Sequence, residues 1–367
     1  MDNIVRCKKC ILPIKLPSVK LDGKGICNHC NQHEKINSNW NSSKKQKKVT
    51  FEEHVYQAKK LKQSYDCLVP LSGGKDSTYA LYLCNNVYKM KTLCITFDNG
   101  YLSDYAKKNI SNALSVSRAD HLYFKVNRNT LLNLYGLFIE RTGNFCSVCM
   151  RGIDYSMQMA VNTFKIPLLI IGGGQRVRYL GILPELFEDG NPDFFNNVVK
   201  GTYLENEGNI LIKKGKDSIT LALTNRIIGK VKRTFKLPTT KRIQIYDYFD
   251  VNYDEIYETL RKEMGWEKNK EQFEHMDCKI HDIALYLHTR KFPDLTTSTV
   301  YHSGLIRLGQ MDRDEALRIE NEKMSSPKIP ENLYEFLEDI KIKKEEFESA
   351  TRDWRSIDKY RKKKLFG

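Results

Sequence analysis

The segment that most constrains this chain is an apolar run that ends in one serine and two glycines. Residues 68 to 78 read LVPLSGGKDST, and an amphipathic pattern typical of a helix follows. Glycines let the backbone turn sharply, and the N–H groups of such a turn, together with the positive end of the next helix, favour a bound anion. Ser72, Ser77 and Thr78 add hydroxyl groups, and Lys75 adds a positive charge. The pattern predicts a phosphate-binding loop.

This loop differs from a Walker A loop, because the four-residue spacing between glycines and the Gly-Lys-Ser/Thr ending are absent. An ordinary strand-to-helix turn that contains two glycines is the plain alternative. The hydroxyl groups and the lysine around Gly73 and Gly74 favour the phosphate-binding interpretation.

The chain around this loop alternates short apolar runs with longer helical patterns. Predicted strands cover Cys67 to Leu71, Thr92 to Phe97, His121 to Val126 and Pro167 to Ile171. Predicted helices follow Lys75, begin at Asp104 and Thr130, and follow Cys149. Strands separated by helices of this length predict an α/β fold, with a parallel sheet, helices on both faces, and ligands at the carboxyl ends of the strands.

Composition divides the chain into five parts. Residues 1–36 are rich in cysteine and turn formers, and residues 37–50 are polar, which predicts a linker. Residues 51–184 hold the phosphate-loop domain, residues 185–240 are interpreted as an insertion or lid, and residues 241–367 are mainly helical. In this last part, helices are predicted over Asn252 to Trp266 and around Cys278 to His288. Asp312 is the predicted N-cap of a further helix.

Four cysteines near the N-terminus form two C-x-x-C pairs with 16 residues between them. These cysteines are Cys7, Cys10, Cys27 and Cys30. Their spacing is typical of a zinc ribbon with four thiolate ligands. A closed tetrahedral shell leaves no position for substrate, so the predicted Zn²⁺ is structural and folds a segment too short to have its own core. Unligated thiols are the alternative, and His29 and His33 could substitute as ligands.

A second group of cysteines lies farther along the chain. Cys146 and Cys149 form another C-x-x-C pair, and Cys278 is the natural third ligand. Three cysteines with one open coordination position suit a [4Fe-4S] cluster whose free iron carries a labile group. A zinc site with a histidine, a redox-active thiol pair and plain buried cysteines are the alternatives.

The net charge is strongly positive for a chain of 367 residues, at +15. Such a surface attracts polyanions, including RNA, nucleotides and anionic membranes. Lysine-rich solvated faces are the plain alternative, since no aromatic-interleaved RNA motif accompanies the basic runs. We see no export signal and no apolar run long enough to span a bilayer, which predicts a cytoplasmic protein whose cysteines are reduced or bind metal.

At Ser72 to Ser77 the chain resembles the PP-loop ATP pyrophosphatase superfamily, whose signature S-G-G-x-D-S is matched residue for residue. The resemblance covers residues 66–174. It implies an enzyme that cleaves ATP between the α and β phosphates, places AMP on a substrate oxygen, and lets a nitrogen or sulfur nucleophile displace it. Lys75 and Asp76 are the implied catalytic residues. Asp76 is also the candidate Mg²⁺ ligand, because pyrophosphate leaves more readily when its charge is neutralised.

The resemblance also implies which residues bind the nucleotide. They are Ser72, Gly73, Gly74, Lys75, Asp76, Ser77, Thr78, Phe97, Asp98, Gly172 and Gly173. Phe97 and Asp98 match the family position that holds the adenine and the ribose. The strand that ends at Gly172 and Gly173 lacks the acidic residues that several relatives carry there, so the second metal ligand stays unassigned.

The whole chain resembles the N-acetyl sugar amidotransferase group of that superfamily. The resemblance rests on the N-terminal ribbon, the segment from Phe145 to Ile153, Cys278 and the segment from Arg313 to Ala316. It implies that an acetamido group on a nucleotide-linked N-acetyl sugar becomes an acetamidino group, as part of surface-polysaccharide (lipopolysaccharide) biosynthesis. Adenylation makes the amide oxygen a leaving group, and ammonia then attacks the activated carbon. A separate glutaminase subunit would supply the ammonia, and a homodimer is a further expectation.

Two other functions stay open. One is iron–sulfur-dependent sulfur transfer to tRNA or a small molecule, which the three cysteines and the basic surface favour. Some PP-loop tRNA thiolases show a similar arrangement of cysteines. The other is a non-catalytic nucleic-acid-binding zinc protein that keeps a nucleotide pocket as a sensor, and the intact loop from Ser72 to Ser77 argues against it.

Overall fold

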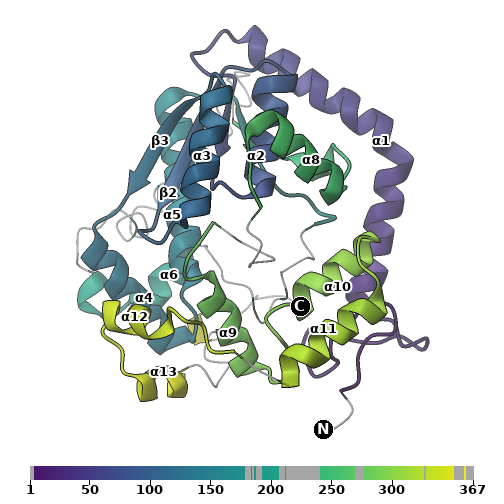
Figure 1. The fold of residues 1–367 in the computed structure, drawn as a ribbon. Helices are drawn as coiled ribbons and strands as arrows, with labels where there is room; N and C mark the ends of the chain where they lie inside the picture. The colour runs from purple at the N-terminus through teal and green to yellow at the C-terminus, as the bar shows by residue number, and fades with distance from the viewer. Residues whose placement is uncertain are drawn as a thin grey trace.

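A computed structural model gives the fold of the chain (Figure 1). It describes residues 4–177, 183, 186, 192–205, 211, 240–268, 277–325, 328–350 and 359–360. Most of the predicted insertion or lid, residues 185–240, lies outside the described residues.

A five-stranded sheet in the order β3-β2-β1-β4-β5 forms the centre of the fold, and each neighbouring pair of strands is parallel. The strands are β1 (Cys67–Pro70), β2 (Thr92–Asp98), β3 (Asp120–Lys125), β4 (Leu168–Ile171) and β5 (Lys241–Gln244). The first four strands confirm the predicted ones to within a residue or two. The predicted parallel α/β sheet is therefore confirmed.

The strand β5 is missing from the sequence-based prediction, which assigned mainly helix from residue 241 onward. Its four residues read KRIQ, and only Ile243 is buried. Such an edge strand contributes a single apolar side chain to the core, so neither a period of two nor an apolar run marks it in the sequence. Its pairing with β4 decides its conformation.

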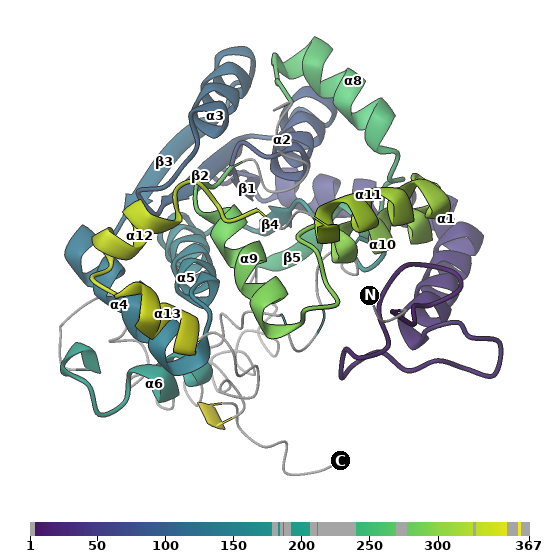
Figure 2. The same ribbon diagram turned by 60° about the horizontal axis from the view of Figure 1, so that its bottom comes forward.

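The helices lie on both faces of the sheet and beyond one end of it (Figures 1 and 2). They are α1 (Asn28–Lys60), α2 (Lys75–Leu81), α3 (Asp104–Val116), α4 (Arg128–Thr142), α5 (Cys146–Phe164), α6 (Pro192–Val199), α8 (Tyr253–Met264), α9 (His281–Lys291), α10 (Thr299–Leu308), α11 (Arg313–Ser325), α12 (Leu333–Asp339) and α13 (Lys344–Ala350). The mainly helical C-terminal region is confirmed for the part of it that the structure describes.

Successive residues of a strand face opposite sides of the sheet, and the two sides have different partners. On one side, Val69 and Cys94 share an apolar cluster with residues of α1, α2, α3 and α8. On the other side, Leu68 and Leu93 pack against Met157 of α5. A further cluster joins α4, α5, α6, α9, α12 and α13, and it reaches the sheet at Phe97 of β2. Both faces of the sheet are thus covered, as a parallel sheet requires.

Residues 37–50, predicted as a linker, are helical instead. They form the middle of α1, which continues without a break from Asn28 to Lys60 along one side of the molecule (Figure 1). No glycine or proline interrupts this span, and Lys and Gln are good helix formers, so the polar composition is compatible with a helix. Trp40, within the expected linker, is buried with 3% of its surface exposed. Packing of this side chain fixes a segment that the sequence pattern leaves undecided.

The start of α11 is the one predicted from a capping side chain. Asp312 accepts hydrogen bonds from the N–H groups of Asp314 and Glu315, which confirms the predicted N-cap of α11. Two other predictions were wrong in detail. The helix α5 begins at Cys146 rather than after Cys149, so this C-x-x-C pair lies in its first turn. Cys278 precedes α9 rather than lying in it.

Candidate nucleotide-binding site and metal centre

The predicted phosphate loop lies between the carboxyl end of β1 and the start of α2. Gly73 has a φ of +81°, a conformation that glycine adopts at little cost. A Cβ atom on Gly73 would lie 2.5 Å from the backbone oxygen of Ala106 in α3. Both the dihedral angle and the close approach of α3 therefore require glycine at this position.

The serine hydroxyls of the loop bond to the loop itself. Ser77 Oγ accepts from the N–H of Ser72 at 3.2 Å and donates to the carbonyl of Gly74 at 3.0 Å. Ser72 Oγ accepts from the N–H of Gly74 at 3.3 Å and lies 3.2 Å from Ser77 Oγ. These bonds fix the conformation of the turn. The hydroxyl of Thr78 is buried and donates to the carbonyl of Gly74 four residues earlier, so it is bonded within the first turn of the helix.

The back of the loop is braced by residues that the sequence did not single out for this role. The carbonyl of Gly73 accepts a hydrogen bond from Trp266 Nε1 at 2.9 Å and another from Asn109 Nδ2 at 3.4 Å. Trp266 follows α8 and Asn109 lies in α3. These two bonds hold the Gly73 carbonyl. Since the N–H groups of Ser72 and Gly74 are bonded to the serine hydroxyls, an anion would bind the remaining N–H groups at the start of α2.

Lys75 and Asp76 are adjacent at the start of α2, and they contact each other. Lys75 Nζ lies 3.2 Å from Asp76 Oδ2 and 4.7 Å from the centre of the Tyr253 ring. Burial by itself would lower the pKa of Lys75, but the carboxylate of Asp76 and the nearby tyrosines raise it well above its usual value. The lysine is therefore a cation at neutral pH, as the predicted role requires.

Tyr246 is a further contact of Asp76 that the sequence did not reveal. Its hydroxyl donates to Asp76 Oδ1 at 2.6 Å. Burial, and after it the negative charge of Asp76, raises the pKa of Tyr246 well above its usual value, so the hydroxyl stays protonated and donates. Tyr246 comes from the turn after β5, the strand that the sequence did not predict. This contact fixes the direction of the Asp76 carboxylate.

The glycines after β4 differ in what surrounds them. A Cβ atom on Gly172 would lie 2.4 Å from the backbone carbon of Asp76, so the end of β4 touches the start of α2. A Cβ atom on Gly174 would lie 2.7 Å from Tyr246 Cβ. Gly173 meets no atom within 4 Å. Of the three glycines, Gly173 therefore faces open space beside the phosphate loop.

The residues predicted to hold the adenine and ribose lie at the end of β2. Phe97 is buried and lies against Gly152 of α5, so its ring belongs to the core. Asp98 forms an ion pair with Lys125 at 2.8 Å. Partial burial would raise the pKa of Asp98, but the hydrogen bonds from Lys125 and the N–H of Gly100 outweigh it and lower the pKa. Asp98 is thus a charged acceptor at the carboxyl edge of the sheet.

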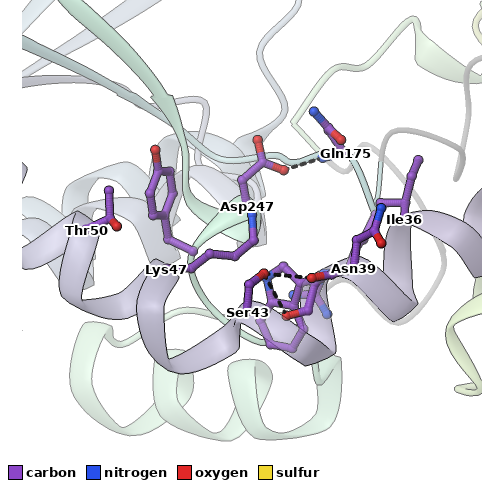
Figure 3. A pocket seen from close by; sticks show the side chains of 10 residues that line it. Ile36, Asn39, Ser43, Lys47, Thr50, Gln175 and Asp247 are labelled. Atoms are coloured by element: carbon purple, nitrogen blue, oxygen red, sulfur yellow. Dashed lines mark hydrogen bonds between the residues drawn. The ribbon is translucent and has the colours of Figure 1, made fainter.

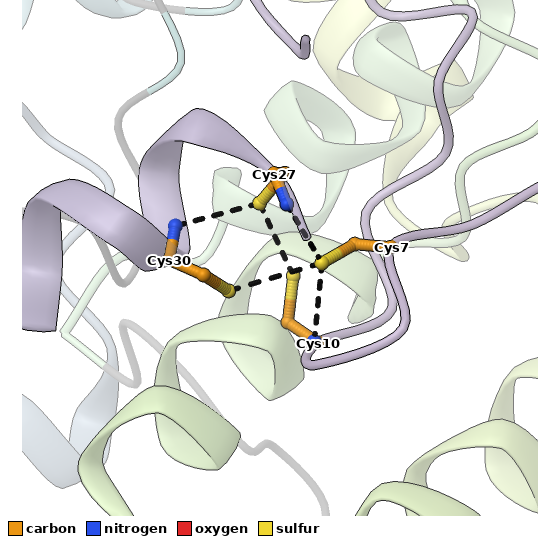
Figure 4. Close-up of side chains that lie close together, drawn as sticks. All are labelled: Cys7, Cys10, Cys27 and Cys30. Carbon is orange, nitrogen blue, oxygen red and sulfur yellow. Dashed lines mark hydrogen bonds between the residues drawn. The ribbon is translucent and has the colours of Figure 1, made fainter. Parts of the chain in front are cut away.

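The four N-terminal cysteines lie together and are buried (Figure 4). Their sulfur atoms are all within 4.8 Å of one another, with Cys7 and Cys30 3.9 Å apart and Cys10 and Cys27 3.8 Å apart. Four ligands at the usual zinc–sulfur distance of about 2.3 Å would stand about 3.8 Å apart in a tetrahedron. The donor set and its spacing therefore fit a tetrahedral metal ion.

Backbone N–H groups also point at this cluster of sulfur atoms. Cys7 Sγ accepts from the N–H of Lys9 at 3.4 Å and from that of Cys27 at 3.2 Å. Hydrogen bonds from the other thiols of the cluster lower the pKa of Cys7 far below its usual value. Arg313 of α11 donates to the carbonyls of Cys7 and Cys10, at 3.1 and 3.2 Å. This arginine, which lies 303 positions beyond Cys10, ties the ribbon to the C-terminal helices.

In the second predicted cysteine group, Cys149 and Cys278 meet at Asn99, the residue after β2. Asn99 Nδ2 lies 3.4 Å from Cys149 Sγ and 3.8 Å from Cys278 Sγ, and Tyr135 Oη lies 3.0 Å from Cys149 Sγ. Burial raises the pKa of Cys278 to about 12 and also raises that of Cys149. Cys146, Cys149 and Cys278 all pack against the apolar cluster that joins α4, α5 and α9. Within the described ranges, only the four N-terminal cysteines form a group as compact as a single metal ion needs.

A polar pocket of about 460 Å³ lies between α1 and the turns that follow β4 and β5 (Figure 3). Its lining includes Asn39 and Lys47 of α1, Gln175 after β4 and Asp247 after β5. The N–H of Gln175 donates to Asp247 Oδ1 at 2.7 Å. Because parallel strands end at the same edge, this pocket opens at the same edge of the sheet as the phosphate loop. The sequence did not predict it.

No helix among the described residues combines the length and the apolar character that crossing a bilayer requires.

Comparison with known proteins finds a family match for the C-terminal part of the chain. Residues 267–367 match the family of the C-terminal domain of WbpG-like LPS biosynthesis proteins. An uncharacterized protein of Methanocaldococcus jannaschii, MJ1599, is 30% identical over 169 residues, which are 46% of this chain and 58% of that protein. The chain thus spans little more than half the length of this relative.

Among solved structures, the U34-tRNA thiolase NcsA from Methanococcus maripaludis with its [4Fe-4S] cluster is similar. It is 17% identical and has a TM-score of 0.32, with 84% of this chain and 89% of NcsA covered.

Proposed function

We propose that the chain is an enzyme of the PP-loop superfamily and that it binds ATP at the loop from Ser72 to Ser77, whose sequence matches the superfamily signature. In the proposed reaction, ATP is cleaved between its α and β phosphates, and AMP is placed on a carbonyl or amide oxygen of a second substrate. Pyrophosphate leaves, and a nucleophile then displaces AMP. We place this reaction in the cytoplasm.

The observation that carries the proposal is the conformation of the loop at the start of α2. Its serine hydroxyl groups and the Gly73 carbonyl are bonded within the protein. A Cβ atom added to Gly173, after β4, would have no atom within 4 Å. The positive end of α2 and the cation of Lys75 favour phosphate there. Negative charge that develops on the leaving pyrophosphate is stabilised by such preorganised groups. Mg²⁺ would be held by Asp76, whose carboxylate oxygens are the ligands that this ion prefers.

We propose nitrogen as the incoming atom and an N-acetyl sugar as the acceptor. The match of residues 267–367 to a domain of LPS biosynthesis proteins supports a substrate of surface-polysaccharide synthesis. An amide oxygen is a poor leaving group, and adenylation makes it a good one, so ammonia can form an amidine. A glutaminase partner would supply the ammonia. The four N-terminal thiolates would hold a structural Zn²⁺.

Sulfur transfer is the second candidate, and the position of Cys149 and Cys278 favours it. Both sulfur atoms face Asn99 at the carboxyl edge of the sheet, the edge at which the phosphate loop lies. A [4Fe-4S] cluster holds each thiolate on a different iron, farther apart than the thiolates of one zinc ion, and Cys146 is the remaining candidate ligand. In this alternative a cluster would supply the sulfur for a tRNA or a small molecule.

The test is acceptor-dependent formation of AMP and pyrophosphate by the purified full-length chain under anaerobic conditions. We expect AMP only when ATP, Mg²⁺ and a nucleotide-linked N-acetyl sugar are present, and a product that accumulates only when ammonia is added. Replacement of oxygen by NH lowers the mass of the acceptor, whereas replacement by sulfur raises it. A product of higher mass, formed when sulfide is added or when tRNA is the acceptor, would support the second candidate, sulfur transfer. No pyrophosphate with any acceptor would contradict both.

A further inference from the structure

Asp277 reaches the edge of the phosphate loop from a distant part of the chain. Its segment pairs in antiparallel fashion with the residues between β2 and α3, through a bridge between Leu102 and Cys278. The N–H of Ser103 donates to the carbonyl of Asp277 at 3.1 Å, and the N–H of Lys279 donates to that of Tyr101 at 2.7 Å. Two backbone hydrogen bonds, one on each side of the bridge, therefore fix the position of Asp277.

The carboxylate of Asp277 lies against the glycine pair. A Cβ atom on Gly74 would lie 3.8 Å from Asp277 Oδ2. Only Ser72 Oγ is closer to that position, at 3.3 Å. Gly74 is the N-cap residue of α2, where the positive end of the helix is exposed. A negatively charged side chain thus borders the place where phosphate groups are expected.

A carboxylate beside a triphosphate is repulsive unless a cation lies between them. Mg²⁺ in nucleotide sites is bound by one or two carboxylates together with phosphate oxygens. Asp76 supplies one carboxylate, oriented by Tyr246 and Lys75, and the strand end at Gly172 to Gly174 supplies none. We propose that Asp277 is the second carboxylate ligand of the Mg²⁺ that accompanies ATP. This inference rests on the proposed binding of ATP but not on any acceptor.

The proposal gives the C-terminal part of the chain a role in the nucleotide site. Asp277 and Cys278 are consecutive, and they lie within the region that matches the WbpG-like C-terminal domain. Asp277 borders the phosphate loop, and Cys278 faces Asn99. The same short segment therefore contacts the loop and the cysteine pair.

The test measures ATP binding by titration calorimetry on the full-length chain, in Mg²⁺ and again in EDTA. For Asp277→Asn we expect ATP affinity in Mg²⁺ to fall by about 10- to 100-fold, since even residues behind metal ligands contribute this much. In EDTA the variant should bind ATP as tightly as the wild type or more tightly, because a repulsive charge is gone. Asp277→Glu, which keeps a carboxylate, should retain part of the Mg²⁺ effect.

Asp104→Asn is the matched control. Asp104 is an exposed carboxylate next to Ser103, and it pairs with Lys107 and Lys279 on the surface. We expect its ATP affinity to match the wild type in both buffers. As a second readout, Mn²⁺ electron paramagnetic resonance should show ATP-dependent loss of the free-ion signal with the wild type and the control, and little loss with Asp277→Asn.

The outcomes of this experiment distinguish a failure of the Asp277 inference from a failure of the proposed function. If Asp277→Asn tightens ATP binding equally in Mg²⁺ and EDTA, Asp277 only repels phosphate and is not a ligand. If the wild type binds ATP but Asp277→Asn leaves both the affinity and the Mn²⁺ signal unchanged, the inference is wrong while the proposed function stands. If the wild type binds no ATP in either buffer, the proposed function is wrong and this inference with it.

Discussion

Gly73 is the residue of the phosphate loop with the least freedom to change. Gly73→Ala should lower the free energy of unfolding by about 1 to 3 kcal/mol, because a side chain at a positive φ is strained and would also collide with α3. Urea unfolding followed by circular dichroism measures this. Gly173→Ala is the matched control, since Gly173 has no atom within 4 Å of the added carbon, and its stability should stay within about 0.5 kcal/mol. Equal losses in the two variants would contradict the loop geometry.

Asp76 and Tyr246 should differ in how strongly they affect the reaction. Asp76→Asn keeps the size of the side chain but removes the charge, so we expect pyrophosphate release to fall by about 100-fold or more. Tyr246→Phe removes only the hydrogen bond to Asp76 Oδ1, and a fall of about tenfold or less is expected. Single-turnover pyrophosphate release measures both. A larger loss in Tyr246→Phe than in Asp76→Asn would mean that the tyrosine, and not the carboxylate, contacts the reacting groups.

At the scale of elements, Trp40 attaches the first half of the long helix α1 to the sheet domain, while Phe51 and Val55 in its second half pack in the apolar cluster on the sheet. The guanidinium of Arg176 lies 3.5 Å from the centre of the Trp40 ring, and Arg176 also donates to the carbonyls of Tyr246 and Phe249. Both side chains are buried. This contact joins α1 to the turns after β4 and β5, which also line the polar pocket.

Trp40→Ala should therefore lower the free energy of unfolding by about 3 kcal/mol or more, because it leaves a large cavity and removes the cation–π contact. Val49→Ala is a control on the same helix, at a side chain that is 54% exposed, and it should change stability by less than about 0.5 kcal/mol. Chemical denaturation at matched protein concentration compares the two. If Trp40→Ala is as stable as the wild type, the contact between Trp40 and Arg176 does not stabilise the fold.

At the scale of the whole molecule, the cysteine ribbon is bonded to the C-terminal helices. Arg313 binds the carbonyls of Cys7 and Cys10, and Arg6 donates to the carbonyl of Asp294. Loss of order in the ribbon would therefore release contacts on α11 and on the segment before α10. The ribbon is thus an integral part of the fold as well as a candidate metal site.

Removal of metal should lower the thermal unfolding temperature of the full chain by several degrees, because metal binding contributes to folding free energy. A zinc chelator should cause the shift, and added Zn²⁺ should reverse it. Acid should act like the chelator, since thiolates must be deprotonated to bind metal and protons compete as the pH falls. Cys7→Ser should show the lowered temperature without chelator. Thermal unfolding that is independent of chelator, zinc and this substitution would exclude a structural metal.

The sequence by itself determined the features that are local in the chain. The strand, the loop from Ser72 to Ser77 and the helix after it are contiguous, so residue types and spacing were enough to place them. The two N-terminal C-x-x-C pairs were equally readable, because metal ligation imposes a fixed spacing. The four apolar strands of the sheet followed from their hydrophobic pattern.

Only the tertiary structure decided which distant residues meet these features. Tyr246 reaches Asp76 from 170 positions away, and Trp266 reaches Gly73 from 193 positions away. Sequence spacing carries no record of such contacts, since they depend on how strands and helices pack. The same reason explains β5 and the helical segment 37–50, whose conformations are fixed by β4 and by burial of Trp40 rather than by their own patterns.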